Sequence, residues 1–286
     1  MPHAHVNGVD LYYERSGPPD APLVALSNSI GATLEMWEPQ WEALSRTHGV
    51  LRYDTRGHGR SGVLDRPATV DDLADDLVGL LDALRVDRAH IAGLSLGGMT
   101  AQSLAARHPQ RVISLTLMAT ACHITPASRW EGLERLAREQ GMAALVDGAM
   151  ERWFTADFAR RRPDLVAAVR ARFLAMDPRG YAVCCGVIRG MDLRPSLARI
   201  TAPTMIIAGA EDTATTLAHA EQLREGIHDA ELVVLPRVAH MLTLARPASV
   251  NAYLASFLSR FPEEGGNDDD HQERLRAGNG VSGAPG

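Results

Sequence analysis

The sequence predicts an α/β protein in which a mostly parallel sheet carries helices on both faces. Short apolar runs that predict strands alternate with longer stretches that predict helices, and this alternation is typical of parallel sheets. The clearest helix spans residues 70–84, where Thr69 can cap the N-terminus and leucines recur with the helical period. Between about residues 127 and 200 the alternation stops, which indicates a helical insertion.

The strands are predicted from apolar and β-branched runs that end at turn signals. The first two lie within residues 5–15, on either side of the turn signal Asn7-Gly8. The remaining strands are expected at residues 23–26, 50–53, 90–93, 112–119, 205–209 and 231–235. Helices are expected between and after them at residues 38–45, 70–84, 96–108, 217–225 and 247–260.

These elements divide the chain into three parts. Residues 1–123 and 201–261 should form the α/β core. Residues 124–200 contain helical patterns at 133–138, 142–154 and 164–176 but no convincing strand, so we expect them to form a lid. Residues 262–286 carry −4 of the net charge of −6 and almost nothing apolar, so we expect an acidic, disordered tail.

The composition excludes several classes of protein. The net charge of −6 argues against a nucleic-acid binder, which normally has a basic surface. All 29 basic residues are Arg, so a Lys nucleophile or Schiff base is excluded. The three cysteines fit no disulfide framework or zinc motif and indicate a reducing compartment. With no signal peptide and no apolar run of about 20 residues, we expect a cytoplasmic protein without a membrane partner.

The strongest chemical signal is the sequence Gly-Leu-Ser-Leu-Gly at residues 93–97. It lies between a predicted strand and a predicted helix, where this pattern forms a strained turn that presents the Ser hydroxyl at the end of a sheet. Such a turn is crowded and needs small residues on either side, and Gly98 extends the run. The alternative is a glycine-rich helix start that only packs closely. The context favours Ser95 as a nucleophile.

A serine nucleophile needs a base, and the base needs an acid that orients it. In folds with this turn the chain order is Ser, acid and His. Asp212 and His240 each follow a predicted strand, so both should lie at the edge of the sheet where ligands bind. Glu211 is the rival for the acid, and a simple surface-loop histidine is the alternative for His240.

Acyl transfer also needs hydrogen-bond donors for the oxyanion. One should be the backbone N–H of Leu96, directly after the nucleophile. The second should come from the loop after the strand at 23–26, and by position we assign the N–H of Ile30. This loop commonly carries His-Gly, and Asn28-Ser29 stands there instead. The chemistry needs no metal or organic cofactor.

Four stretches of the chain carry a family resemblance. They are LSNSIG at 26–31 with EMW at 35–37, RYDTRGHG at 52–59, GLSLGGM at 93–99, and GYAVCC at 180–185 with MDLR at 191–194. On these residues the chain resembles the 3-oxoadipate enol-lactonase family of the β-ketoadipate pathway, which has the α/β-hydrolase fold. The resemblance extends from residue 6 to residue 261.

The resemblance implies a catalytic triad of Ser95, Asp212 and His240, with Trp130 and the lid helices over the substrate. It also implies hydrolysis of the enol-lactone to 3-oxoadipate in aromatic catabolism. Two positions depart from the family pattern. The run 213–216 after Asp212 lacks proline, and Met-Leu stands after His240 where the family tends to have Ser-Asn.

The implied substrate is a small anionic lactone, so its carboxylate needs a partner. Without Lys that partner must be Arg, His or backbone N–H, and Arg129 and Arg189 from the lid region are candidates. A solvated surface Arg is an equally good interpretation of each. A related esterase, lactonase or perhydrolase is the alternative function, as is a binder that keeps the triad. The sequence does not set the oligomeric state.

Three other conspicuous groups are expected to be structural. Asp54 and His58 lie near the end of a predicted strand and should form hydrogen bonds without taking part in catalysis. Cys184 and Cys185 have no His or acid at a matching position, so we interpret them as part of the lid core.

Overall fold

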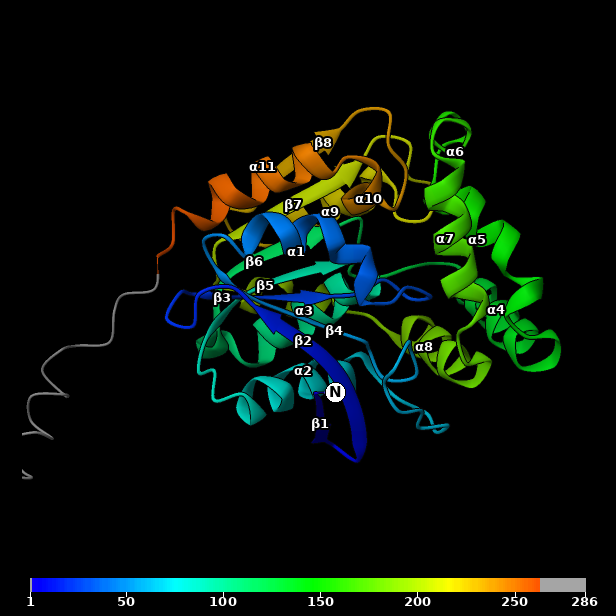
Figure 1. Ribbon diagram of the computed structural model, residues 1–286, viewed down its shortest axis with the longest axis horizontal. Helices are drawn as coiled ribbons and strands as arrows, with labels where there is room; N and C mark the ends of the chain where they lie inside the picture. The colour runs from blue at the N-terminus through cyan, green and yellow to red at the C-terminus, as the bar shows by residue number, and fades with distance from the viewer. Residues whose placement is uncertain (1, 263–286) are drawn as a thin grey trace, which may run out of the picture.

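A single eight-stranded sheet organises the chain in the computed structural model, which describes residues 2–262 (Figure 1). The strand order is β1-β2-β4-β3-β5-β6-β7-β8; β1 and β2 pair antiparallel and the strands from β4 to β8 are parallel. This confirms the predicted fold class. The strands are β1 (His3–Val6), β2 (Val9–Ser16), β3 (Leu23–Ser27), β4 (Gly49–Tyr53), β5 (Ala89–Leu94), β6 (Val112–Met118), β7 (Thr204–Gly209) and β8 (Glu231–Leu235).

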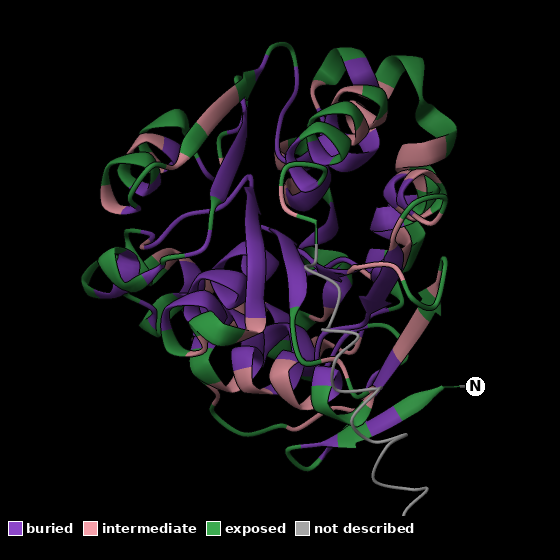
Figure 2. Cartoon of the chain, turned by 90° about the vertical axis from the view of Figure 1, so that its left-hand side faces the viewer, coloured by how far each residue is buried: buried purple, intermediate pink, exposed green. Residues whose placement is uncertain are grey.

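The central strands are buried on both faces, as Figure 2 shows by their purple colour. Every residue of β3, β4, β5 and β6 is buried, which explains why their sequences read as continuous apolar runs without alternation. In the register of β3 and β5, Ser27 lies opposite Gly93. The loops that leave the carboxyl ends of these two strands therefore start side by side.

Helices cover both faces of the sheet. Helices α2 and α3 pack on one face, while α1 and α11 pack together on the other (Figure 1). Thr69 caps α2 as predicted, because its hydroxyl accepts the N–H of Asp72 at 3.2 Å. The bounds are α1 (Glu38–Leu44), α2 (Val70–Ala83), α3 (Leu96–Arg107), α9 (Leu217–Gly226), α10 (Leu242–Ala245) and α11 (Pro247–Leu258), with short 3₁₀ turns η1 (Leu34–Trp37), η2 (Pro109–Arg111), η3 (Met142–Ala144) and η4 (Arg194–Arg199).

The segment between β6 and β7 contains five helices. They lie on the side toward which the arrows of β3 and β5 point (Figure 1). The sequence predicted three helical stretches and missed α6 and α8, because α6 is short and α8 contains three glycines that lower helix propensity. The helices are α4 (Ala127–Gln140), α5 (Val146–Trp153), α6 (Ala156–Arg161), α7 (Pro163–Leu174) and α8 (Pro178–Gly190).

Two expectations concern the ends and the environment of the chain. The predicted acidic tail lies outside the described residues from residue 263 onward. Within residues 2–262, none of the helices is both long and apolar enough to cross a membrane.

Candidate active site

Ser95 sits on a strained turn between β5 and α3. Its backbone has φ 56° and ψ −115°, a conformation that non-glycine residues rarely adopt. The end of β6 holds it there, because its N–H donates to the carbonyl of Met118 at 2.9 Å and the Thr120 hydroxyl donates to its carbonyl at 2.7 Å. The turn therefore has the strained strand–turn–helix geometry that the sequence pattern predicts.

The glycines around Ser95 let three backbone segments approach closely. A Cβ atom added to Gly93 would lie 2.2 Å from the carbonyl oxygen of Gly97. One added to Gly97 would lie 2.0 Å from the carbonyl oxygen of Ser27, at the end of β3. Gly98 faces Thr120 in the same way, at 2.6 Å. The predicted crowding of the turn is therefore confirmed, and it brings the loop after β3 against the start of α3.

His240 and Asp212 form a buried pair on the loops after β8 and β7. The Nδ1 atom of His240 lies 2.8 Å from Oδ2 of Asp212, and the side chains are 3% and 0% exposed. Glu211, the rival for the acid, is exposed. An Nδ1–H donated to Asp212 leaves Nε2 of His240 as the basic nitrogen.

Asp212 is held as a carboxylate by its own loop. The N–H of Ala214 and the N–H of Thr215 donate to Oδ1 at 2.7 and 3.1 Å, and the Thr215 hydroxyl donates to Oδ2 at 2.7 Å. Burial acts to raise the pKa of Asp212, but the charge and hydrogen bond of His240 and the bonds from Thr215 outweigh it, so the pKa is lowered. The run without proline thus supplies the donors that hold the acid.

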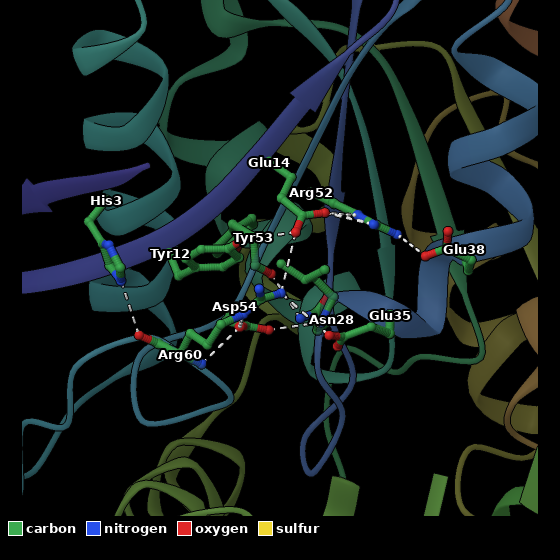
Figure 3. A network of polar contacts seen from close by, with 11 residues as sticks. His3, Tyr12, Glu14, Asn28, Glu35, Glu38, Arg52, Tyr53, Asp54 and Arg60 are labelled. Atoms are coloured by element: carbon green, nitrogen blue, oxygen red, sulfur yellow. Dashed lines mark hydrogen bonds and ion pairs between the residues drawn. The ribbon is translucent and has the colours of Figure 1, made fainter. Parts of the chain in front are cut away.

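Polar side chains fix the loop that carries Ile30. The Asn28 side chain donates to the carbonyl of Tyr53 at 2.8 Å (Figure 3). It also accepts the indole N–H of Trp37 at 2.8 Å. The N–H of Gly31 donates to Nε2 of His58 at 3.0 Å. His58 is thus used structurally, as predicted, and the N–H of Ile30 forms no hydrogen bond within residues 2–262.

Asp54 has the structural role that the sequence predicted. Its carboxylate accepts the N–H of Leu34 at 2.8 Å and the N–H of Arg60 at 2.9 Å, which joins the start of η1 to the loop after β4 (Figure 3). Burial raises the pKa of Asp54 to about 6 in spite of these two bonds.

The Leu96 N–H belongs to the first position of α3 and has no partner within its helix, so it is free to bind an anion.

The predicted site residues gather around one cavity of about 30 Å³. Ser95, His240, Ile30, Trp130 and Arg129 all line it. These side chains come from the loops after β3 and β8, the turn at Ser95, and helix α4. Asp212 contacts His240 and does not itself line the cavity.

Arg189 is placed elsewhere. It does not line the cavity of Ser95, because its guanidinium pairs with Glu134 at 2.9 Å and borders a separate depression. Arg152, and not Arg189, is the second arginine beside Arg129 in the lining of this cavity. It lines the cavity from α5, and the sequence carried no motif that could have marked it.

Three donor groups in the cavity wall, the side chains of Arg129, Trp130 and Arg152, have no hydrogen-bond acceptor among the described residues. The guanidinium of Arg152 forms no ion pair or side-chain hydrogen bond within residues 2–262, and the same holds for Arg129. Burial lowers the pKa of Arg152, and the nearby charge of Arg129 lowers it further. The indole Nε1 of Trp130 is buried without an acceptor. A buried donor without an acceptor costs free energy, so the wall is arranged for an acceptor-rich ligand.

The cysteine pair takes no part in this site. Cys184 and Cys185 are buried free thiols of α8. Burial raises the pKa of both thiols, that of Cys184 to about 12, so neither is a thiolate at neutral pH.

Comparison with known proteins places this site in a family. The profile of the alpha/beta hydrolase fold matches residues 22–181. The chain is 36% identical to 3-oxoadipate enol-lactonase 2 of Acinetobacter baylyi, over 88% of this chain and 94% of that protein. It is 32% identical to a Variovorax paradoxus protein named as a carbamate hydrolase, RutD, over 89% and 98%. The crystal structure of the enol-lactonase from Burkholderia xenovorans LB400 superposes with a TM-score of 0.89 at 41% identity, covering 90% of this chain and all of that one.

The chain therefore belongs to the alpha/beta hydrolase fold family, and it is a hydrolase. The resemblance to enol-lactonases that the four sequence stretches carry is confirmed by these relatives.

Proposed function

We propose that the chain hydrolyses 3-oxoadipate enol-lactone to 3-oxoadipate, with Ser95 as nucleophile, His240 as base and Asp212 as the acid that orients it. The observation that carries the proposal is the pair of guanidinium groups, Arg129 and Arg152, that line the Ser95 cavity without acidic partners. A carboxylate on the substrate would satisfy them, and Arg is well suited to that task. A neutral ester would leave both charges unpaired.

In the first half of the reaction, the lactone carbonyl lies between Ser95 and the N–H groups of Ile30 and Leu96. His240 accepts the Ser95 proton through Nε2 as Oγ attacks the carbonyl carbon. The negative oxygen then receives hydrogen bonds from the two N–H groups. Asp212 remains a carboxylate and stabilises the imidazolium.

Collapse of this intermediate breaks the ring C–O bond and leaves the acyl group on Ser95. The enol oxygen takes a proton from His240, and the enol then rearranges to the ketone. His240 next removes a proton from water, which attacks the acyl carbon and releases the new carboxylate. Ser95 regains its proton from His240, so each turnover consumes one water molecule.

The decisive experiment is a direct assay with the enol-lactone, beside p-nitrophenyl acetate and a carbamate. We expect kcat/KM to be highest for the enol-lactone, and Ser95→Ala to lower its turnover about 10⁶-fold with an unchanged melting temperature. Turnover retained by Ser95→Ala would contradict the nucleophile. A higher kcat/KM for p-nitrophenyl acetate or for the carbamate would replace the lactonase by an esterase or by the activity named for RutD.

The role of Arg152 has its own test. Arg152→Met should lower kcat/KM for the anionic lactone about 10- to 100-fold, because a hydrogen bond to a charged group contributes about 1.5–3 kcal/mol. It should change kcat/KM for the neutral p-nitrophenyl acetate less than about threefold.

Arg189→Met is the matched control, since Arg189 is half exposed and outside the cavity. Its kcat/KM for the lactone should equal that of the unmodified protein. Equal losses on both substrates in Arg152→Met would show a general defect and would contradict recognition of the carboxylate.

A further inference from the structure

A second, larger hollow lies behind one wall of the Ser95 cavity. It is a groove of about 390 Å³ between α7 of the helical insertion and the core. Its lining combines apolar residues, among them Leu165, Val169 and Met241, with the charged residues Glu35, Glu38, Arg162 and Arg172. The Ser95 cavity is much smaller, at about 30 Å³.

Among residues 2–262, Trp153 is the one residue shared by the linings of the cavity and the groove. On either side of it the two hollows are lined by residues that are neighbours in sequence. Ile30 and His240 line the cavity, while Gly31 and Met241 line the groove. The hollows are therefore separated by a wall of about one residue, and Trp153 contributes its largest side chain.

The indole of Trp153 is held in this position. Its side chain is buried and packs edge-to-face on Phe173, with ring centroids 5.6 Å apart. Its carbonyl accepts the N–H of Met241 at 3.0 Å, which ties the end of α5 to the residue after the catalytic base. The departure from the family pattern after His240 thus adds a groove-lining side chain next to the wall.

We propose that Trp153 sets the length of substrate that the site accepts. The groove, which the indole separates from the Ser95 cavity, is a binding site for the aliphatic chain of an ester held at Ser95. With the indole in place, a compact ring such as a small lactone has only the cavity, and a long chain has no path. Without the indole, a chain of about six or more carbons would enter the groove and bury its methylenes away from water. The proposal rests on Ser95 as the nucleophile of the proposed function and is independent of the enol-lactone.

The first experiment compares p-nitrophenyl acetate, butyrate and octanoate in Trp153→Ala. The ratio of kcat/KM for octanoate to kcat/KM for acetate should rise at least about tenfold over the unmodified protein. If the alanine variant unfolds, Trp153→Leu takes its place, since it keeps a buried apolar side chain. It should shift the ratio in the same direction. An unchanged ratio in a folded variant would overturn the proposal.

A second substitution tests whether the groove itself holds the chain. Ala168→Trp fills the groove from α7 and, added to Trp153→Ala, should return the octanoate-to-acetate ratio to its original value. Ala167→Trp is the matched control, because Ala167 is an exposed residue of the same helix that does not line the groove. It should leave the gain of Trp153→Ala intact. A gain that survives both additions would place the chain elsewhere and overturn the proposal.

A binding measurement separates this inference from the proposed function. In a Ser95→Ala background, Trp153→Ala should tighten the binding of decanoate at least about tenfold by calorimetry. If the enol-lactone is not turned over but the ester ratio shifts and this tightening occurs, the proposed function fails and the groove proposal stands. If esters are hydrolysed but neither the ratio nor decanoate binding changes, the proposed nucleophile stands and the groove proposal fails.

Discussion

Thr215 is the residue on which the acid of the site depends most directly. Its hydroxyl donates to Oδ2 of Asp212, the same oxygen that His240 contacts, and its N–H donates to Oδ1. A carboxylate with several donors keeps its charge and its orientation. Thr215 also lines the Ser95 cavity and lies 3.4 Å from Nδ1 of His240, so it positions both members of the pair.

Thr215→Val removes the hydroxyl but keeps the shape and the backbone N–H. We expect kcat to fall about 10- to 100-fold with little change in KM, because a hydrogen bond to a carboxylate worth about 1.5–3 kcal/mol is lost. Thr215→Ser should restore most of kcat, since it returns the donor. A rise in KM instead of a fall in kcat, or failure of the serine variant to restore activity, would show a packing role only.

At this scale, chain order predicted the positions of Ser95, Asp212 and His240, because each follows a recognisable strand. Arg152 and Thr215 could not be predicted in the same way. No local pattern marks them, and they reach the site only through the packing of α5 and the turn after Asp212. The expectation for Arg189 shows the same limit, since only the fold reveals its pairing with Glu134.

His58 joins the loop after β4 to the loop after β3, which carries Ile30. His58, in the loop after β4, accepts the N–H of Gly31 through Nε2, and its Nδ1 lies 3.2 Å from the carbonyl of Arg56. These partners require a neutral ring with its proton on Nδ1. Burial lowers the pKa of His58 from 6.5 to about 4, which agrees with a neutral imidazole. Protonation of Nε2 would remove the acceptor and release the loop that carries Ile30.

The sign of the resulting pH dependence follows from this lowered pKa. The unfolded chain binds a proton below about pH 6.5, whereas folded His58 does so only near pH 4, so stability falls as pH falls between these values. Between pH 7 and 4.5 the loss from His58 is about 2 kcal/mol. His58→Gln keeps an acceptor but does not titrate. Its free energy of unfolding, measured in urea, should therefore fall by about 2 kcal/mol less between pH 7 and 4.5 than that of the unmodified protein.

The exposed His228→Gln variant serves as the control for this comparison and should retain the full loss. His90, whose pKa burial also lowers to about 4, contributes equally to all three proteins. Equal losses of unfolding free energy in His58→Gln and the unmodified protein would contradict a neutral His58 bonded to the loop that carries Ile30.

Among the elements, the strands were predicted more fully than the helices of the insertion. Fully buried strands such as β3 and β6 leave short apolar runs that any sequence reading detects. Helix α8 is stabilised by contacts that its sequence does not reveal, because Gly180 meets the backbone of Gly57, 123 residues earlier in the chain. Its glycines lower helix propensity and at the same time permit that contact.

For the whole molecule, the important junction is the one between the core and the helical insertion. A Cβ atom added to Gly180 would lie 2.1 Å from the carbonyl oxygen of Gly57, so two backbones touch here without side chains between them. Tyr181, the next residue of α8, lines the Ser95 cavity. The hydrogen bond from the N–H of Met241 to the carbonyl of Trp153 is a second backbone link across the junction. The position of the insertion therefore determines the shape of the cavity.

Gly180→Ala tests this coupling, with Gly132→Ala as its matched control. Alanine favours a helix by up to about 1 kcal/mol over glycine, so Gly132→Ala should raise the melting temperature and leave kcat/KM unchanged, because the new Cβ would contact no described residue beyond its own stretch of helix. Gly180→Ala should lower both the melting temperature and kcat/KM, because the new Cβ pushes α8 and Tyr181 away from the core. A Gly180→Ala variant as stable and as active as the unmodified protein would show that the insertion moves freely, and the cavity would then not depend on this contact.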